Sequence, residues 1–282
     1  MKEHRPPRKP AAWGVKLASC RALSWLPPLR AARKLSLRED VVSGVPPALD
    51  GLKIAYASDV HYGAYLGKDR LRDLAERLNA LEADVLILGG DYGEDAAHGL
   101  AFWEQAPGLH ARLAVCAVLG NHDRAKGSVE DFSRAMRARG VTPLVNGALL
   151  LDVNGARLAV CATDDDRCGE PDLAPVLAQC RGADWVIYAP HMPDALQPAF
   201  AAAQPPFFHL ALCGHTHGGQ ITVFGLPLDV SSGLGWRYGR RHLTGHFKEN
   251  GRDVIVSNGV GVTWLPFRAF APAQYHLITL RA

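Results

Sequence analysis

The chain has 282 residues, of which 48% are hydrophobic and 21% are charged, with a formal net charge of +3. This is the composition of a globular protein with a substantial core, in one large domain or two small ones. No apolar stretch approaches the ~20 uninterrupted residues of a membrane-spanning helix, because Lys16, Arg21 and Pro27-Pro28 interrupt the most apolar N-terminal segment.

The positive charge is concentrated at the N-terminus. Ten basic residues and one acidic residue lie in the first 38 positions, so the rest of the chain is net acidic. We therefore predict a basic arm over residues 1–45 and a single domain over residues 46–282. Apolar residues among the cations, such as Trp13 and Trp25, favour an arm that contacts an anionic membrane surface. The alternative is a disordered basic tail that partly docks on the domain.

After the arm, apolar runs alternate with segments of helical periodicity. Strands are predicted within residues 52–61, 83–91, 113–123, 183–191, 208–217 and 275–280, and helices within 68–81, 96–105, 129–139 and 194–203. Residues 144–163 predict a hairpin that turns at Asn154-Gly155. The alternation predicts a sheet covered by helices, to which the hairpin and the β-rich C-terminal part add antiparallel strands.

The six cysteines favour free thiols. They form no CxxC pair and have no regular spacing, and Cys116, Cys161 and Cys213 lie inside apolar runs. A free thiol in such a run behaves as a small buried hydrophobe. We predict a cytoplasmic protein, held through its arm on the inner face of the cytoplasmic membrane, and no export.

Polar side chains that can bind a metal follow five of the apolar runs. They are Asp59 and His61, then Asp91, then Asn121 and His122, then His191, and last His215 and His217. Taken singly, each has a structural explanation, such as a helix N-cap for an aspartate or a turn for the asparagine. For no metal centre to exist, all of these separate explanations would have to be true at once. The ends of strands at one edge of a sheet, by contrast, are a common place for a functional site. The set therefore predicts a metal centre.

The run LALCGHTHGGQ over residues 210–220 places two histidines one residue apart. If the strand extends through them, its period of two puts His215 and His217 on one face, where both point at one place. Two neutral imidazoles side by side suit a metal ion.

Five motifs occur in the order found in the calcineurin-like metallophosphoesterases. They are D-x-H at Asp59–His61, G-D at Gly90-Asp91, G-N-H-D at Gly120–Asp123, His191 followed by Met-Pro, and G-H-T-H at Gly214–His217. The chain resembles this superfamily over roughly residues 50–282. The runs GHTHGGQ and SNGVGVTWLPFR are most similar to its bacterial YkuE- and YaeI-type phosphodiesterase branch. The resemblance implies an α/β fold, a four-layer α/β/β/α sandwich of two mixed β-sheets flanked by helices.

The resemblance also implies two divalent metal ions per chain. The first would be bound by Asp59, His61, Asp91 and His217, and the second by Asp91, Asn121, His191 and His215. Mixed oxygen and imidazole ligands suit Mn, with Fe and Zn as alternatives. Bridged by one carboxylate, two such ions ~3.5–4 Å apart lower the pKa of a bridging water, and the resulting hydroxide attacks phosphorus at neutral pH.

Two further residues are implied to act in catalysis. His122, beside a ligand, would protonate the leaving oxygen. Glu94 stands three residues after Asp91, where relatives often carry a carboxylate that orients this histidine.

The implied substrate is a phosphodiester or a pyrophosphate. Phosphoprotein phosphatases of the superfamily carry an arginine soon after the bridging aspartate, and the run GDYGED has none. Arg237, Arg240 and Arg241 are candidates to bind a phosphate or a sugar nucleotide, or merely solvate a loop. The apolar run GVTWLPFRAF and the basic arm would fit a lipid-linked substrate, such as UDP-2,3-diacylglucosamine in lipid A synthesis. The alternative is that these apolar residues form core strands.

Two other classes of function are a non-catalytic scaffold and a nucleic-acid-binding protein. A non-catalytic metal-binding scaffold would need lost ligands, and none is missing. A nucleic-acid partner is disfavoured because the arm contains no recognition motif and the rest of the chain is net acidic.

Overall fold

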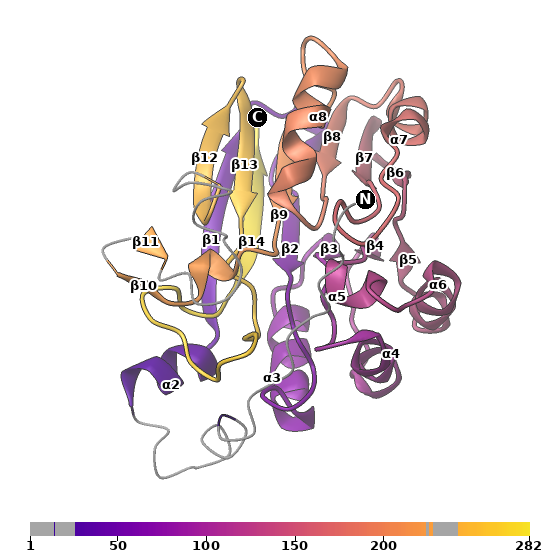
Figure 1. The fold of residues 1–282 in the computed structure, drawn as a ribbon. Helices are drawn as coiled ribbons and strands as arrows, with labels where there is room; N and C mark the ends of the chain where they lie inside the picture. Colours follow the sequence, from indigo (N-terminus) through magenta and orange to yellow (C-terminus); the bar gives the residue numbers. More distant parts are fainter. Residues whose placement is uncertain (1–13, 15–25, 224–225, 228–241) are drawn as a thin grey trace.

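Two six-stranded mixed β-sheets stack face to face in the computed structural model, which describes residues 14, 26–223, 226–227 and 242–282 (Figure 1). Helices cover the outer face of each sheet, which makes four layers. This architecture confirms the predicted α/β/β/α sandwich.

The first sheet has the strand order β1-β14-β2-β3-β4-β5, in which only β14 and β2 pair antiparallel. Its strands are β1 (Ser36–Ser43), β14 (Gln274–Arg281), β2 (Lys53–Ala57), β3 (Val85–Leu88), β4 (Ala114–Ala117) and β5 (Thr142–Pro143). Because β2 to β5 are parallel, their carboxyl ends lie at one edge of the sheet.

The second sheet has the order β12-β13-β9-β8-β7-β6, with antiparallel pairs only at its two ends. Its strands are β12 (Gly245–Glu249), β13 (Arg252–Val256), β9 (Leu210–Cys213), β8 (Trp185–Tyr188), β7 (Ala156–Ala162) and β6 (Gly147–Val153). The predicted hairpin is confirmed as β6 and β7, and both turn residues, Asn154 and Gly155, have positive φ. A separate small ribbon pairs β10 (Thr222–Val223) with β11 (Leu226–Pro227).

Helices lie on both sides of the sandwich, at the bottom and the top of Figure 1. Beside the first sheet are α3 (Lys68–Asn79), α4 (Ala96–Gln105), α5 (Asn121–Arg124) and α6 (Val129–Ala138), and beside the second are α7 (Leu173–Cys180) and α8 (Leu196–Ala202). The remaining helices are α2 (Pro27–Arg33) and the 3-10 turns η2 (Pro47–Leu49), η3 (Pro193–Ala195) and η4 (His217–Gly219). Within the described residues, no helix combines the length and apolarity that a membrane crossing requires.

Strand β2 shows how the chain fills the core. Ile54 and Tyr56 are buried between the two sheets, whereas Ala55 and Ala57 face the helices that cover the first sheet. The small outward alanines let α3 and α4 approach the sheet. Alternation of this kind, with both faces buried, explains why the run reads as continuously apolar.

The described cysteines are all free, and Cys116, Cys161 and Cys213 are fully buried. Each lies in a strand of one of the two sheets. This agrees with their prediction as small buried hydrophobic residues.

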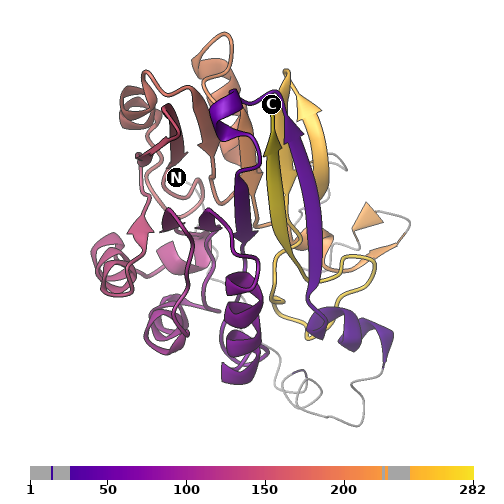
Figure 2. The ribbon, with the colours of Figure 1, turned by 180° about the vertical axis from the view of Figure 1, so that it is seen from behind.

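Part of the segment predicted as an arm belongs to the first sheet. Figure 2 shows β1 in indigo beside the yellow β14, and the two strands pair in parallel from Ser36 to Ser43. The strand escaped prediction because it lies at the sheet edge, where Arg38 and Glu39 stay exposed. Residues 1–13 and 15–25, which carry most of the predicted membrane-contacting residues, lie outside the described residues.

Asp40 connects the open edges of the two sheets. On β1, its Oδ1 lies 3.3 Å from Nδ1 of His246 in β12, and its Oδ2 lies 3.1 Å from Nδ1 of His276 in β14. Burial would raise the pKa of Asp40, but the hydrogen bonds from both histidines outweigh burial and hold the pKa well below its usual range. The hydrogen bond with Asp40 raises the pKa of His246.

We expect Asp40→Asn to destabilise the protein by about 1–2 kcal/mol near pH 5.5, and by less at pH 8.5. The depressed pKa of Asp40 gives stability that is present above its unfolded pKa of ~3.9. The raised pKa of His246 gives stability that is present below its unfolded pKa of ~6.5 and is lost as the pH rises through the folded value. Urea unfolding at the two pH values measures the difference. Asp50→Asn, which removes an exposed pair with Arg281 at 3.7 Å, is the control and should have little effect. An equal loss at both pH values would contradict the account.

Candidate metal centre

The seven residues predicted as metal ligands converge where the strands of both sheets end. Asp59 and His61 follow β2, Asp91 follows β3, Asn121 begins α5 after β4, His191 follows β8, and His215 and His217 follow β9. All seven are at most 9% exposed. The centre therefore lies at the edge between the two sheets, with every donor withdrawn from bulk water.

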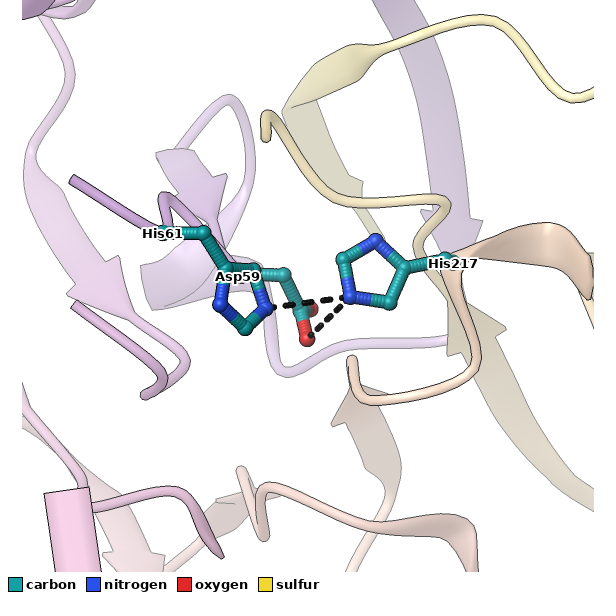
Figure 3. A group of neighbouring side chains, drawn as sticks. All are labelled: Asp59, His61 and His217. Carbon is teal, nitrogen blue, oxygen red and sulfur yellow. Dashed lines mark hydrogen bonds and ion pairs between the residues drawn. The ribbon is translucent and has the colours of Figure 1, made fainter. Parts of the chain in front are cut away.

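Asp59, His61 and His217 form the first group of donors (Figure 3). Nε2 of His217 lies 3.6 Å from Oδ1 of Asp59 and 3.1 Å from Nε2 of His61. One donor atom from each residue lies within 4.8 Å of the other two. A single cation can be reached by all three side chains.

Asp91, His191 and His215 form a second group with the same mutual spacing. Oδ2 of Asp91 lies 3.4 Å from Nε2 of His191 and 3.6 Å from Nε2 of His61. The same carboxylate oxygen therefore faces both groups, as a bridging ligand must.

Two buried atoms of the residues predicted to bind the second ion lack a hydrogen-bond partner among the described residues. They are Oδ1 of Asn121 and Nε2 of His191. Buried polar atoms are normally satisfied, and both atoms are good donors to a divalent cation. The residues present therefore fit a metal ion at this position.

Neighbouring groups orient several of these donors. Nδ1 of His191 lies 2.7 Å from the carbonyl oxygen of Gly89, to which it donates, so Nε2 is the nitrogen directed toward Asp91. The main-chain N–H of His215 donates to the Asp59 carboxylate at 3.0 Å. The main-chain N–H of His122 donates to Oδ1 of Asp91 at 2.8 Å, which leaves Oδ2 toward the two donor groups.

Burial favours the neutral form of three histidines in the centre. It lowers the pKa of His61 to about 3, and it lowers those of His215 and His217 well below the ordinary value. Burial, with the Asp91 carboxylate nearby, raises the pKa of Asp59 to about 6, although His191 opposes the rise. Neutral imidazoles and two adjacent buried carboxylates together form a set that binds cations.

The pKa of Asp91 moves in the opposite direction. Burial would raise it, but the attraction of His191 and His122 outweighs burial and holds the pKa well below its usual range. The same interaction with Asp91 raises the pKa of His191 against the effect of burial.

Five of the seven residues have a left-handed backbone. The φ angles are 54° for Asp59, 47° for His61, 56° for Asp91, 69° for His215 and 53° for His217. Residues other than glycine rarely adopt this conformation. It turns the chain sharply at each strand end, so that the side chains point back into one place.

The predicted strand geometry of His215 and His217 is wrong. Strand β9 ends at Cys213, His215 lies in the following loop, and His217 begins η4. The period of two therefore does not place them. Their two left-handed conformations instead direct His215 to the second group and His217 to the first.

Two motif glycines permit close approach around Asp91. A Cβ on Gly120 would clash with the Asp91 side chain and main chain. A Cβ on Gly90 would lie 2.6 Å from the nitrogen of Gly120 and 2.9 Å from Nδ1 of His191. The G-D and G-N-H-D motifs need glycine because backbone and ligand side chains come together there.

His122 lies beside both groups, and its ring meets that of His61 edge-on at a centroid distance of 4.7 Å. Its Nδ1 lies 2.7 Å from the main-chain oxygen of Glu94, to which it donates. The Glu94 carboxylate instead accepts from the N–H of Ala64 at 2.8 Å. The orienting contact thus comes from the main-chain carbonyl and not from the predicted carboxylate.

Asp123 is a supporting residue that sequence reasoning missed. It is fully buried, and its carboxylate accepts main-chain N–H groups from Asp91, Gly120 and Tyr92 at 2.8–3.1 Å. It therefore fixes the turn that carries Asp91. Its position as the last residue of the G-N-H-D motif could have indicated this supporting role. The predicted substrate residues Arg237, Arg240 and Arg241 lie outside the described residues.

The fold and centre together define a class of metal-dependent hydrolases. A family model described as calcineurin-like phosphoesterase matches residues 52–219, which is more than half of the chain and includes all seven predicted ligands. The chain therefore belongs to the calcineurin-like phosphoesterase family and is a metal-dependent phosphoester hydrolase, as predicted.

Several known proteins are similar to this chain. The chain is 28% identical to the uncharacterized metallophosphoesterase YkuE of Bacillus subtilis, over 84% of this chain and 82% of that protein. It is 30% identical to a Bos taurus transmembrane protein with metallophosphoesterase domain, over 68% of this chain but only 45% of the relative. Among solved structures, a dimetal phosphatase from Danio rerio is 11% identical with a TM-score of 0.46, over 75% of this chain and 88% of that one.

Proposed function

We propose that the protein is a dinuclear metal-dependent phosphoesterase that hydrolyses a phosphodiester or a pyrophosphate bond. The supporting observation is the position of Asp91, whose Oδ2 is 3.6 Å from Nε2 of His61 and 3.4 Å from Nε2 of His191. One buried oxygen shared by two donor groups is the arrangement that holds two cations close together.

The proposed ligands fall into two sets that share this aspartate. Asp59, His61, Asp91 and His217 bind the first ion, and Asp91, Asn121, His191 and His215 bind the second. When bound, such a pair of cations supplies a hydroxide nucleophile at neutral pH and neutralises phosphate oxygens. The mixture of carboxylate, amide and imidazole donors suits Mn, with Fe and Zn as alternatives.

His122 is the proposed general acid. Because its Nδ1 donates to the carbonyl of Glu94, the proton that can move is the one on Nε2. A ring nitrogen of His122 lies within 4.8 Å of donor atoms of His61 and Asp91, so the ring reaches the place where a phosphate would bind. Transfer of this proton to the leaving oxygen would assist bond cleavage.

Sequence favours a diester or pyrophosphate over a phosphoprotein, because GDYGED after β3 contains no arginine. A lipid-linked pyrophosphate such as UDP-2,3-diacylglucosamine, met at a membrane by the basic arm, is the narrower form of the proposal. It rests on residues 1–25 and on the runs of apolar residues near Trp264.

We expect the purified protein to contain two metal ions per chain and, with Mn, to hydrolyse bis-p-nitrophenyl phosphate faster than p-nitrophenyl phosphate. Elemental analysis gives the metal content, and release of nitrophenolate gives both rates. Faster cleavage of the monoester would contradict the diester assignment. Two ions without turnover of either ester would favour a selective lipid-linked pyrophosphatase or the non-catalytic scaffold. A chain with no affinity for metal would contradict the centre itself.

A further inference from the structure

Arg268 is a fully buried arginine in the loop between β13 and β14. Its guanidinium donates to a ring of main-chain carbonyl oxygens. The acceptors and distances are His217 at 3.0 Å, Ala271 at 3.0 Å, Asn258 at 2.7 Å, Gly259 at 3.3 Å, and Gly261 at 3.0 and 2.5 Å. The side chain therefore joins the loop after β13 to the loop that follows β9.

The guanidinium holds His217 at two points. Nη1 lies 3.0 Å from the carbonyl oxygen of His217, and Nη2 lies 3.1 Å from Nδ1 of its ring. A guanidinium has no acceptor, so Nδ1 must accept. Nε2 is then the nitrogen that faces Asp59 and His61, and it carries the ring proton in the metal-free protein. A neutral ring binds a metal through Nε2 only with its proton on Nδ1, so the contact that can persist with a metal bound is the one to the His217 carbonyl.

The charge of Arg268 calls for an explanation. A guanidinium stays protonated at neutral pH, so Arg268 carries a positive charge. Among the described residues, its hydrogen-bond acceptors are main-chain carbonyl oxygens and one ring nitrogen, none of them a carboxylate. An unpaired buried cation is costly, and loops of this size can be held by neutral residues.

We propose that Arg268 is a positioning residue for the first metal ion, and that it does so by fixing the peptide of His217. This inference rests on the proposed dinuclear centre. The left-handed backbone of His217, with φ of 53°, would otherwise relax and carry the ring away from Asp59. The main-chain N–H of Arg268 donates to the carbonyl of Pro28 at 3.0 Å, which fixes the arginine itself to α2.

The test compares Arg268→Lys and Arg268→Gln with wild type. We expect Mn affinity at one of the two sites to fall by about 10–100-fold, the usual effect of removing a partner of a metal-ligating histidine. After dialysis, the variants should retain one ion per chain where wild type retains two. Arg252→Gln is the matched control, because Arg252 also donates to a carbonyl, that of Pro206 at 2.9 Å, but on β13 away from the centre.

Thermal unfolding with and without Mn separates positioning from general stability. A merely structural arginine would lower the unfolding temperature equally in EDTA and in Mn. A positioning arginine lowers mainly the gain that Mn produces, since that gain follows metal affinity. Variants that bind two ions with wild-type affinity would overturn the inference, whereas wild type that binds none would overturn the proposed function instead.

Discussion

Replacement of Asp91 by asparagine is expected to lower kcat/KM for a phosphodiester by at least about 10³-fold, because the Lewis-acid contribution of bound cations is worth several kcal/mol. Oδ2 of Asp91 faces donors of both groups, at 3.6 Å from His61 and 3.4 Å from His191. An amide is neutral and keeps only one oxygen, so it cannot neutralise and bridge two cations. Metal content after dialysis should fall below two ions per chain.

The matched control for this variant is Asp253→Asn. Asp253 is also buried, but its carboxylate pairs with His246 at 2.9 Å and Lys248 at 3.1 Å, outside the centre. This control should lose stability and keep both ions. If Asp91→Asn retained two ions and hydrolysed the diester within 10-fold of wild type, the bridging role would be wrong.

His122→Ala is expected to lower kcat by about 10²–10⁴-fold, the usual contribution of a general acid, while metal content stays at two ions per chain. The proton on Nε2 is lost, but Asp59, Asp91 and the other proposed ligands remain. Because p-nitrophenolate leaves readily without a proton, the defect should be larger for diphenyl phosphate than for bis-p-nitrophenyl phosphate. Steady-state kinetics with the two diesters measures this contrast.

Glu94→Gln distinguishes the two ways in which Glu94 could orient His122. The main chain, which accepts from Nδ1 of His122, is unchanged in this variant, so kcat should fall by less than about 10-fold. A loss as large as that of His122→Ala would restore the carboxylate to the orienting role. Loss of metal from His122→Ala would instead make that ring a ligand, since it lies within reach of His61 and Asp91.

Periodicity located the helices closely and the strands less well. Helices predicted at 68–81 and 129–139 are α3 over Lys68–Asn79 and α6 over Val129–Ala138. The run 208–217 contains β9, but the strand ends at Cys213. Its final residues, Gly214–His217, are as buried as the strand, but His215 and His217 adopt left-handed conformations that hydrophobicity does not report.

Two elements lacked a usable signal. Strand β1 contains the charged run Arg38–Asp40, and it is stabilised by pairing with β14, more than 230 residues away. Helix α7 has eight residues with Pro175 inside, too short and too interrupted for a clear period. Both depend on contacts that are remote in sequence.

The motifs identified the seven candidate ligands that the structure brings together. They did not identify most of the residues that hold these ligands in position. Asp123 lies within the G-N-H-D motif, but the motif alone does not show that its carboxylate accepts the main-chain N–H of Asp91. Arg268 lies in the run WLPFR, where one arginine among apolar residues has no period and no partner in sequence. Only the folded chain shows that its guanidinium reaches His217.

The left-handed conformations of Asp59, His61, Asp91, His215 and His217 also bear on the history of the chain. Each conformation costs of order 1–3 kcal/mol for a residue other than glycine. If the side chain had no function, a substitution by glycine at any of these positions would remove the strain and would increase the stability of the fold. A lineage that had stopped using its metals would be expected to lose these side chains first. Their joint survival in this sequence argues for a centre that is still under selection.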